Sequence, residues 1–227
     1  MAANLPLFPL STVLMPGAPL PLHIFEPRYR QLTVDLVTGA VPDKQFGVIA
    51  VREGWTPESD PADEAGGLHR VGCTAELIDA RRLPDGRFDI VTRGVRRFRL
   101  LHVDAEARPY LTGEVEYVPD EPAAAPDDLP ALATAARAAH RRYCVTAWKS
   151  GDWSEPADDT EPAELPHLLA ADCLLPLADR QRLLEQTRAA IRLRMVRALL
   201  IREAGLLHRL RAVPAPMHTY AVEHSAN

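Results

Sequence analysis

Residues 5–10 read LPLFPL, and residues 15–30 continue as MPGAPLPLHIFEPRYR. Proline lacks a backbone donor and is confined to the edges, first residues and bulges of strands. This apolar, proline-rich stretch therefore predicts two short extended pieces, Leu5–Leu10 and Leu20–Ile24, which Pro16-Gly17 separates.

The pattern changes at Glu26-Pro27, where a proline at a first helical position predicts a helix that ends at Gly39. The apolar residues expected near one face of this helix are Ile24, Tyr29, Leu32, Leu36 and Val37.

Further apolar and alternating runs predict about six strands before residue 118, with a hairpin turn at LPDGR, residues 83–87. A polar stretch at 53–67 is expected to be an exposed loop. The expected strands after the helix are Gln45–Arg52, buried on both faces, then Val71–Ile78, Phe88–Thr92, Phe98–Val103 and Leu111–Val118.

Beyond a Pro-, Ala- and Asp-rich linker at 119–130, the apolar period lengthens to about 3.6 residues, which predicts helices. We expect them at Leu129–Ala147, about Glu164–Leu174 and Leu177–Leu184, with an acidic loop at 150–162. A last helix has one apolar face, which must pack on something, and an opposite face with arginines. The apolar face holds Ala189, Leu193, Val196, Leu200, Ala204 and Leu207, and the opposite face Arg188, Arg192, Arg202 and Arg209.

Composition limits the class of protein. A chain of 227 residues with 47% hydrophobic residues can form a real core, and its net charge of −5 disfavours a general nucleic-acid binder. Cys73, Cys144 and Cys173 are far apart and form no C-x-x-C pair, which predicts buried free thiols in a reducing compartment. Without a leader-like N-terminus or a membrane-length apolar stretch, we expect a cytoplasmic protein without membrane contact.

The opening motif, LPLFPL followed by PG and PLHIFEPRY, resembles the start of the substrate-binding N-terminal domain of Lon-type ATP-dependent proteases. It is especially similar to small stand-alone bacterial proteins made of that domain alone. Later segments follow in the order seen in that family, and together they cover nearly the whole chain. These are VGCTAE at 71–76, LPDGR at 83–87, RGVRRFRL at 93–100, PYL at 109–111, LLPLADRQRLLE at 174–185 and REAGLL at 202–207.

The resemblance implies an α+β fold. Its parts would be a PUA-like β pseudo-barrel with one short helix at 1–118, a linker at 119–130, a helical bundle with a long last helix at 131–213, and a loose tail at 214–227. The resemblance also implies a non-enzymatic protein that recognises polypeptide segments, either unfolded clients or one dedicated partner. An adaptor role in proteolysis is one option, and the oligomeric state stays open.

Enzymatic chemistry has no support in the sequence. No glycine is followed by lysine, so the G-x-x-x-x-G-K-[ST] phosphate cradle is absent. Lys149 abuts Ser150 beside an acidic loop, without the oriented base that an activated nucleophile needs. We expect no catalytic residue and no cofactor.

Metal binding is also disfavoured. His140 and Cys144 are four residues apart on an expected helix and present two ligand types on one face, but no second His/Cys pair has zinc-like spacing. We expect no metal here, but a packed thiol beside a half-exposed imidazole.

The remaining function is binding through exposed apolar and aromatic groups rimmed by charge, which can hold an extended peptide. Alternatively, Phe25 and Tyr29 staple the first helix to the barrel, the tryptophans join the bundle to its loop, and His23 is a strand residue without chemistry. The candidate peptide-binding residues are Met15, Leu20, His23, Phe25, Tyr29, Trp148 and Trp153.

A second hypothesis is a PUA-like RNA-binding module, in which arginines contact phosphates and a phenylalanine stacks on a base. Against it, Arg97 and Arg99 of a strand face one way and Arg96 the other, and Gly94 indicates a bulge. Arginines paired with neighbouring carboxylates are the favoured reading. The alternative nucleic-acid-binding residues are Arg93, Arg96, Arg97, Phe98 and Arg99.

Overall fold

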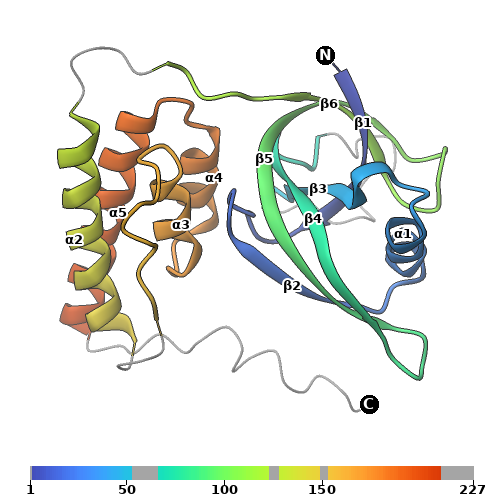
Figure 1. The fold of residues 1–227 in the computed structure, drawn as a ribbon, viewed down its shortest axis with the longest axis horizontal. Coiled ribbons are helices and arrows are strands. Elements are labelled where there is room, and N and C mark those ends of the chain that lie inside the picture. The colour runs from blue at the N-terminus through green and yellow to red at the C-terminus, as the bar shows by residue number, and fades with distance from the viewer. Residues whose placement is uncertain (1, 53–65, 123–127, 149–152, 211–227) are drawn as a thin grey trace.

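A computed structural model describes residues 2–52, 66–122, 128–148 and 153–210. Its strands all belong to the N-terminal half of the molecule, between Ala2 and Tyr117. Within these residues, six strands make one mixed sheet in the order β2-β5-β4-β3-β1-β6. Because β5 also pairs with β6, the sheet curls round on itself (Figure 1). The strands are β1 Ala2–Leu10, β2 Pro19–Ile24, β3 Gln45–Ala50, β4 Val71–Arg82, β5 Phe88–Asp104 and β6 Thr112–Tyr117.

Two of the expected strands are in fact one. The sequence predicts separate strands at 88–92 and 98–103, whereas β5 runs through both. Its pairing with β4 shifts register between Cys73 and Ala75, opposite Arg97 and Gly94, so the irregularity at Gly94 is a bulge that bends the strand without ending it.

Helix α1, Pro27–Thr38, covers one end of the curled sheet, and Gly39 ends it in the left-handed conformation at φ 81°. Tyr29 is buried and stacks on Phe8 of β1, with ring centroids 3.9 Å apart. Val37, expected on the inner face, is instead 52% exposed. Asp35 is the residue that turns inward, because the Tyr110 hydroxyl donates a hydrogen bond to its carboxylate at 2.7 Å. A short 3-10 helix, Pro42–Lys44, leads into β3.

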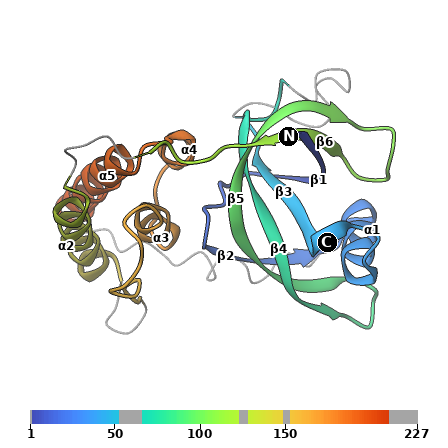
Figure 2. The same ribbon diagram turned by 45° about the horizontal axis from the view of Figure 1, so that its top comes forward.

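The second half contains four helices among its described residues: α2 Leu129–Ala147, α3 Leu165–Ala171, α4 Leu177–Glu185 and α5 Ala189–Leu210. Helices α2 and α5 lie side by side, and α3 and α4 lie between them and the sheet (Figure 2). Leu193, Val196, Leu200 and Ala204 of α5 are buried, as expected. No helix in the described part of the chain is both long and apolar enough to span a membrane.

Buried polar contacts join the two halves. Arg192, expected on the outer face of α5, is fully buried and donates to Asp120 from Nη1 at 2.8 Å and from Nη2 at 2.5 Å. Asp120 also pairs with Arg97 of β5, which in turn donates to the backbone carbonyls of Leu184 and Gln186. One carboxylate therefore links the sheet to the bundle.

The α+β fold expected from the sequence is confirmed. Several expected segments lie wholly or partly outside the described residues. They are the polar loop at 53–67, the linker at 119–130, the loop at 150–162 with the neighbouring Lys149, and the tail at 214–227.

Candidate functional site

A pocket of about 490 Å³ lies where the two halves meet. Its β side is formed by the connection between β1 and β2 together with the start of β2, residues 12–15 and 18–20. Its helical side consists of Trp148 at the end of α2, Trp153, residues 171–174 at and after the end of α3, and Arg180 of α4. Most of this lining is apolar.

Local backbone contacts hold the β side of the pocket in place. Gly17 has a φ of 78°, which only glycine adopts readily, and its amide donates to the Gly94 carbonyl at 2.8 Å. The Ala18 amide donates to the Met15 carbonyl at 3.1 Å. The proline-glycine break recognised in the sequence is thus a turn that presents Met15 and Leu20 to the pocket.

Arg180 fixes the helical side against the β side. Its Nη1 donates to the carbonyls of Ala170 and Cys173, each at 3.2 Å, and its Nη2 donates to the Val13 carbonyl at 3.0 Å. Burial lowers the pKa of this guanidinium from its ordinary value. The three carbonyls partly compensate the buried positive charge, so Arg180 holds the two sides together in a mostly apolar pocket.

The structure brings together four of the seven candidate peptide-binding residues, because Met15, Leu20, Trp148 and Trp153 all line this pocket. Met15 is fully buried in its wall, and Leu20 and both tryptophans are half-buried. The other three residues lie outside it. Nothing in the local sequence indicates that the end of α2 returns to the β1–β2 connection, so the pocket as such was not predicted.

The three remaining candidates sit toward the far end of β2 and in α1. Tyr29 packs in the core against Phe8, whereas Phe25 is 61% exposed. His23 is exposed, with its Nδ1 2.8 Å from Asp89 Oδ1.

The alternative nucleic-acid surface is divided by the fold. Phe98 is fully buried and Arg97 nearly so, so neither side chain reaches the surface. Arg96 lies over the Tyr117 ring, with 3.4 Å between the guanidinium carbon and the ring centroid. Arg93 and Arg99 are exposed. The Phe98 ring, which was the expected stacking group for RNA, is therefore not available at the surface.

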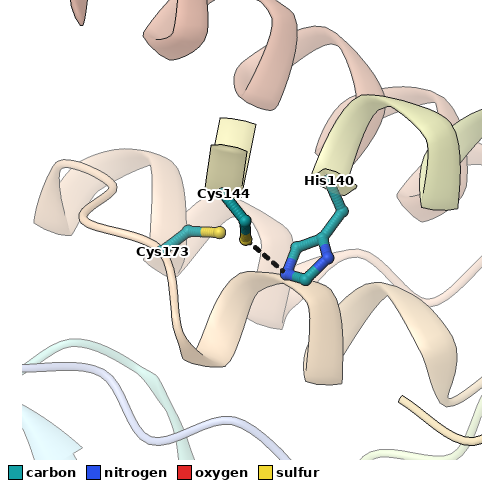
Figure 3. Close-up of side chains that lie close together, drawn as sticks. All are labelled: His140, Cys144 and Cys173. Atoms are coloured by element: carbon teal, nitrogen blue, oxygen red, sulfur yellow. Dashed lines mark hydrogen bonds between the residues drawn. The ribbon is translucent and has the colours of Figure 1, made fainter. Parts of the chain in front are cut away.

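A second group of side chains, drawn in Figure 3, adjoins the pocket through Cys173, which lines it. His140 and Cys144 of α2 and Cys173 after α3 hold their ligand-type atoms within 4.8 Å of one another, and all three residues are buried. The Cys144 sulfur lies 3.4 Å from His140 Nε2. The expected burial of the free thiols is confirmed, but the expected half-exposed imidazole is wrong, because Trp153 packs edge-on against the His140 ring.

The thiols of this cluster differ in acidity. Hydrogen bonds from Cys173 and from His140, acting against burial, lower the pKa of Cys144 to about 6. Its interaction with Cys144, and then burial, raise the pKa of Cys173, whose sulfur donates a hydrogen bond to the Leu169 carbonyl at 3.1 Å.

Most of the chain matches one known protein family. The family model described as "ATP-dependent protease La (LON) substrate-binding domain" matches residues 4–202. The chain belongs to the Lon substrate-binding domain family. The resemblance drawn from the opening motif is thereby confirmed.

Relatives agree with this assignment. The chain is 30% identical to a Lon protease of Anaeromyxobacter dehalogenans, over 90% of this chain and 24% of that protein, and 29% identical to Lon protease 2 of Myxococcus xanthus, over 89% and 24%. This chain thus spans about a quarter of the length of these relatives. The matches cover the Lon substrate-binding domain and not its ATPase or protease domains.

Solved structures show the same fold. A Lon N-terminal domain protein from Xanthomonas campestris superposes with a TM-score of 0.60 at 24% identity, over 93% of this chain and 99% of that one. The N-terminal domain of a Mycobacterium avium complex Lon protease gives a TM-score of 0.62 at 20% identity, over 87% and 98%.

Proposed function

We propose that this protein binds extended apolar segments of polypeptides in the pocket between its two halves. The observation that carries the proposal is the pocket itself, whose apolar walls come from both halves of a Lon substrate-binding domain. Its volume of about 490 Å³ lies within the range of roughly 300–1,000 Å³ typical of ligand sites.

The walls of the pocket suit the individual side chains of a peptide better than the surface of a folded protein. Burying one Leu- or Phe-sized side chain contributes about 1.5–3 kcal/mol, so a few such side chains give useful affinity without a strict sequence. Trp148 and Trp153 add large, flat surfaces against which an apolar side chain can pack.

Pairing of a bound peptide with the neighbouring edge strand β2 contributes less to binding than side chains in the pocket do. Strand β2 is at the end of the sheet order and pairs only with β5 among the described strands. Pro19 and Pro21 deprive it of two backbone donors, and prolines on an edge strand oppose pairing with another chain. Recognition would therefore depend on side chains that enter the pocket.

The test compares two single substitutions by fluorescence anisotropy with a labelled short peptide that alternates Leu and Phe. Leu20→Asp places a carboxylate in the apolar wall, and we expect binding to weaken by at least about tenfold, which is about 1.4 kcal/mol. Ile78→Asp is the control, because Ile78 is 57% exposed on β4 and does not line the pocket. Circular dichroism checks that both variants are folded.

Salt dependence gives the second arm. Binding of the apolar peptide should persist as salt rises, whereas binding of a labelled RNA oligonucleotide to arginines would fall steeply. Equal peptide affinity in the two variants, or salt-sensitive RNA binding without peptide binding, would overturn the proposal.

A further inference from the structure

The cluster of His140, Cys144 and Cys173 adjoins the apolar pocket, and of its three residues Cys173 lines it. Its three side chains come from two separate segments, the C-terminal half of α2 and the turn between α3 and α4. All three are at most 1% exposed. His140 Nδ1 is buried and has no hydrogen-bond partner among the described residues. Burying an imidazole nitrogen without a hydrogen-bond partner costs free energy.

We propose that His140, Cys144 and Cys173 bind a zinc ion. Two sulfurs and one imidazole nitrogen form a donor set that favours Zn²⁺ over Mg²⁺ or Ca²⁺, which prefer oxygen. Zn–S bonds of about 2.3 Å and Zn–N bonds of about 2.0–2.1 Å in a tetrahedron place sulfur and nitrogen about 3.5 Å apart. The observed 3.4 Å between Cys144 Sγ and His140 Nε2 matches that edge.

The charge of the site also suits the ion. When Zn²⁺ binds, the two thiols release their protons to solvent and the imidazole coordinates as the neutral base, with no change of oxidation state. Two thiolates then cancel the double positive charge, so the buried site carries no net charge. The protein supplies three ligands, and water takes the fourth tetrahedral position.

Such an ion would tie the helical side of the pocket together. Cys144 lies one turn before Trp148, whose amide donates to the Cys144 carbonyl at 2.8 Å, and Cys173 itself lines the pocket. A metal bond between α2 and the α3–α4 turn would therefore fix both segments that carry the pocket wall. This inference does not depend on peptide binding.

The test is a Co²⁺ and Zn²⁺ titration of the full chain after reduction and removal of metal with a chelator. Tetrahedral Co²⁺ bound by thiolates gives intense sulfur-to-metal charge-transfer absorption, which Zn²⁺ then removes by displacement. We expect saturation at one ion per chain and a rise of the melting temperature with Zn²⁺. Cys144→Ser and Cys173→Ser should each lose the charge-transfer absorption.

The matched control is Cys73→Ser, because Cys73 is an equally buried thiol on β4 that does not belong to the cluster. This variant should bind the ion as the wild type does. X-ray absorption at the zinc edge of the wild type needs no variant and should show two sulfur neighbours with nitrogen or oxygen completing the shell. Absence of the cobalt absorption in the reduced wild type, its survival in both cluster variants, or a zinc shell without sulfur would overturn the proposal.

Discussion

Asp120 is the residue on which the junction between the two halves depends. The side chains of its partners Arg97 and Arg192 are 3% and 0% exposed. Burial acts to raise the pKa of Asp120, but the hydrogen bonds and charges of Arg192 and then Arg97 outweigh it, and the pKa stays below its ordinary value. The ionised carboxylate is the state that balances two buried cations.

We expect Asp120→Asn to lower the free energy of unfolding by about 3 kcal/mol, because it leaves two buried guanidinium groups without their counter-charge. This is at the lower end for a broken buried pair, since Asp120 itself is partly exposed. Urea unfolding at neutral pH measures the change. The control is Glu121→Gln at the next residue. It breaks an exposed ion pair with Arg188 and should lower the free energy of unfolding by no more than about 1 kcal/mol. Equal losses in the two variants would contradict this role for Asp120.

Residues of this kind show the limit of reading one sequence. Periodicity placed Arg192 on the outer face of α5, since arginines rarely occupy a core. Its partner Asp120 is 72 residues away along the chain, and no local pattern reports that distance. Cys173 was missed as a neighbour of His140 and Cys144 for the same reason.

At the scale of elements, β5 depends on Gly94. A Cβ placed there would lie 2.2 Å from the Met15 carbonyl oxygen, which belongs to backbone and has little freedom to move. Gly94 also donates to the Ala18 carbonyl and accepts from the Gly17 amide. The bulge at Gly94 is therefore the point where β5 packs against the connection between β1 and β2 and hydrogen-bonds to it.

Gly94→Ala should lower the free energy of unfolding by about 3 kcal/mol, as overpacking against fixed atoms does. Gly205→Ala in α5 is the paired control, because nothing lies within 4 Å of the added methyl group and alanine favours the helix. It should raise stability by about 0.5 kcal/mol. Thermal and urea unfolding of both variants test the contrast, which would be lost if Gly94→Ala were as stable as the wild type.

Elements with local signals were predicted best. The bounds of α2 were predicted as Leu129–Ala147, the bounds observed, and its start is marked by Asp128, whose side chain accepts from the Ala131 amide. Helix α1 likewise begins at a proline and ends at a glycine. The bulge expected at Gly94 is observed, but the two strands expected on either side of it are the single strand β5, because β4 pairs alongside both parts.

At the scale of the whole molecule, the junction makes stability depend on pH through His167 of α3. Burial, then the positive charges of Arg192 and Arg97, lower the pKa of this imidazole to about 3, while Asp120 acts weakly in the opposite direction. The unfolded chain binds a proton below its ordinary pKa of 6.5, and the folded chain does not until about 3. The free energy of unfolding contributed by His167 therefore falls as pH falls through that window.

We expect His167→Leu to remove this dependence. Between about pH 7 and about pH 5, the wild type should lose about 2 kcal/mol more of its free energy of unfolding than the variant does. Urea unfolding at the two pH values gives the difference. His102→Gln, at an exposed histidine, should behave as the wild type, and parallel pH profiles for wild type and His167→Leu would refute the assignment.

The pocket belongs to this scale too. Its apolar and aromatic residues were picked out because they lay in the proline-rich opening or beside an acidic loop. The relation between those two places arises only when the bundle docks on the sheet. The sequence therefore points to four residues that line this candidate pocket but not to their assembly, and it groups Tyr29 with them although Tyr29 packs on Phe8.

The pairing of β1 also governs when this protein can fold during synthesis. Ala2 pairs with Glu116, so the sheet cannot close until the ribosome has released the chain past β6. Until then β1 carries unpaired backbone groups, which attract other nascent strands. Pro6 and Pro9 lack backbone donors and reduce that hazard. The proline-rich opening thus offers fewer backbone donors to other chains before β6 is made.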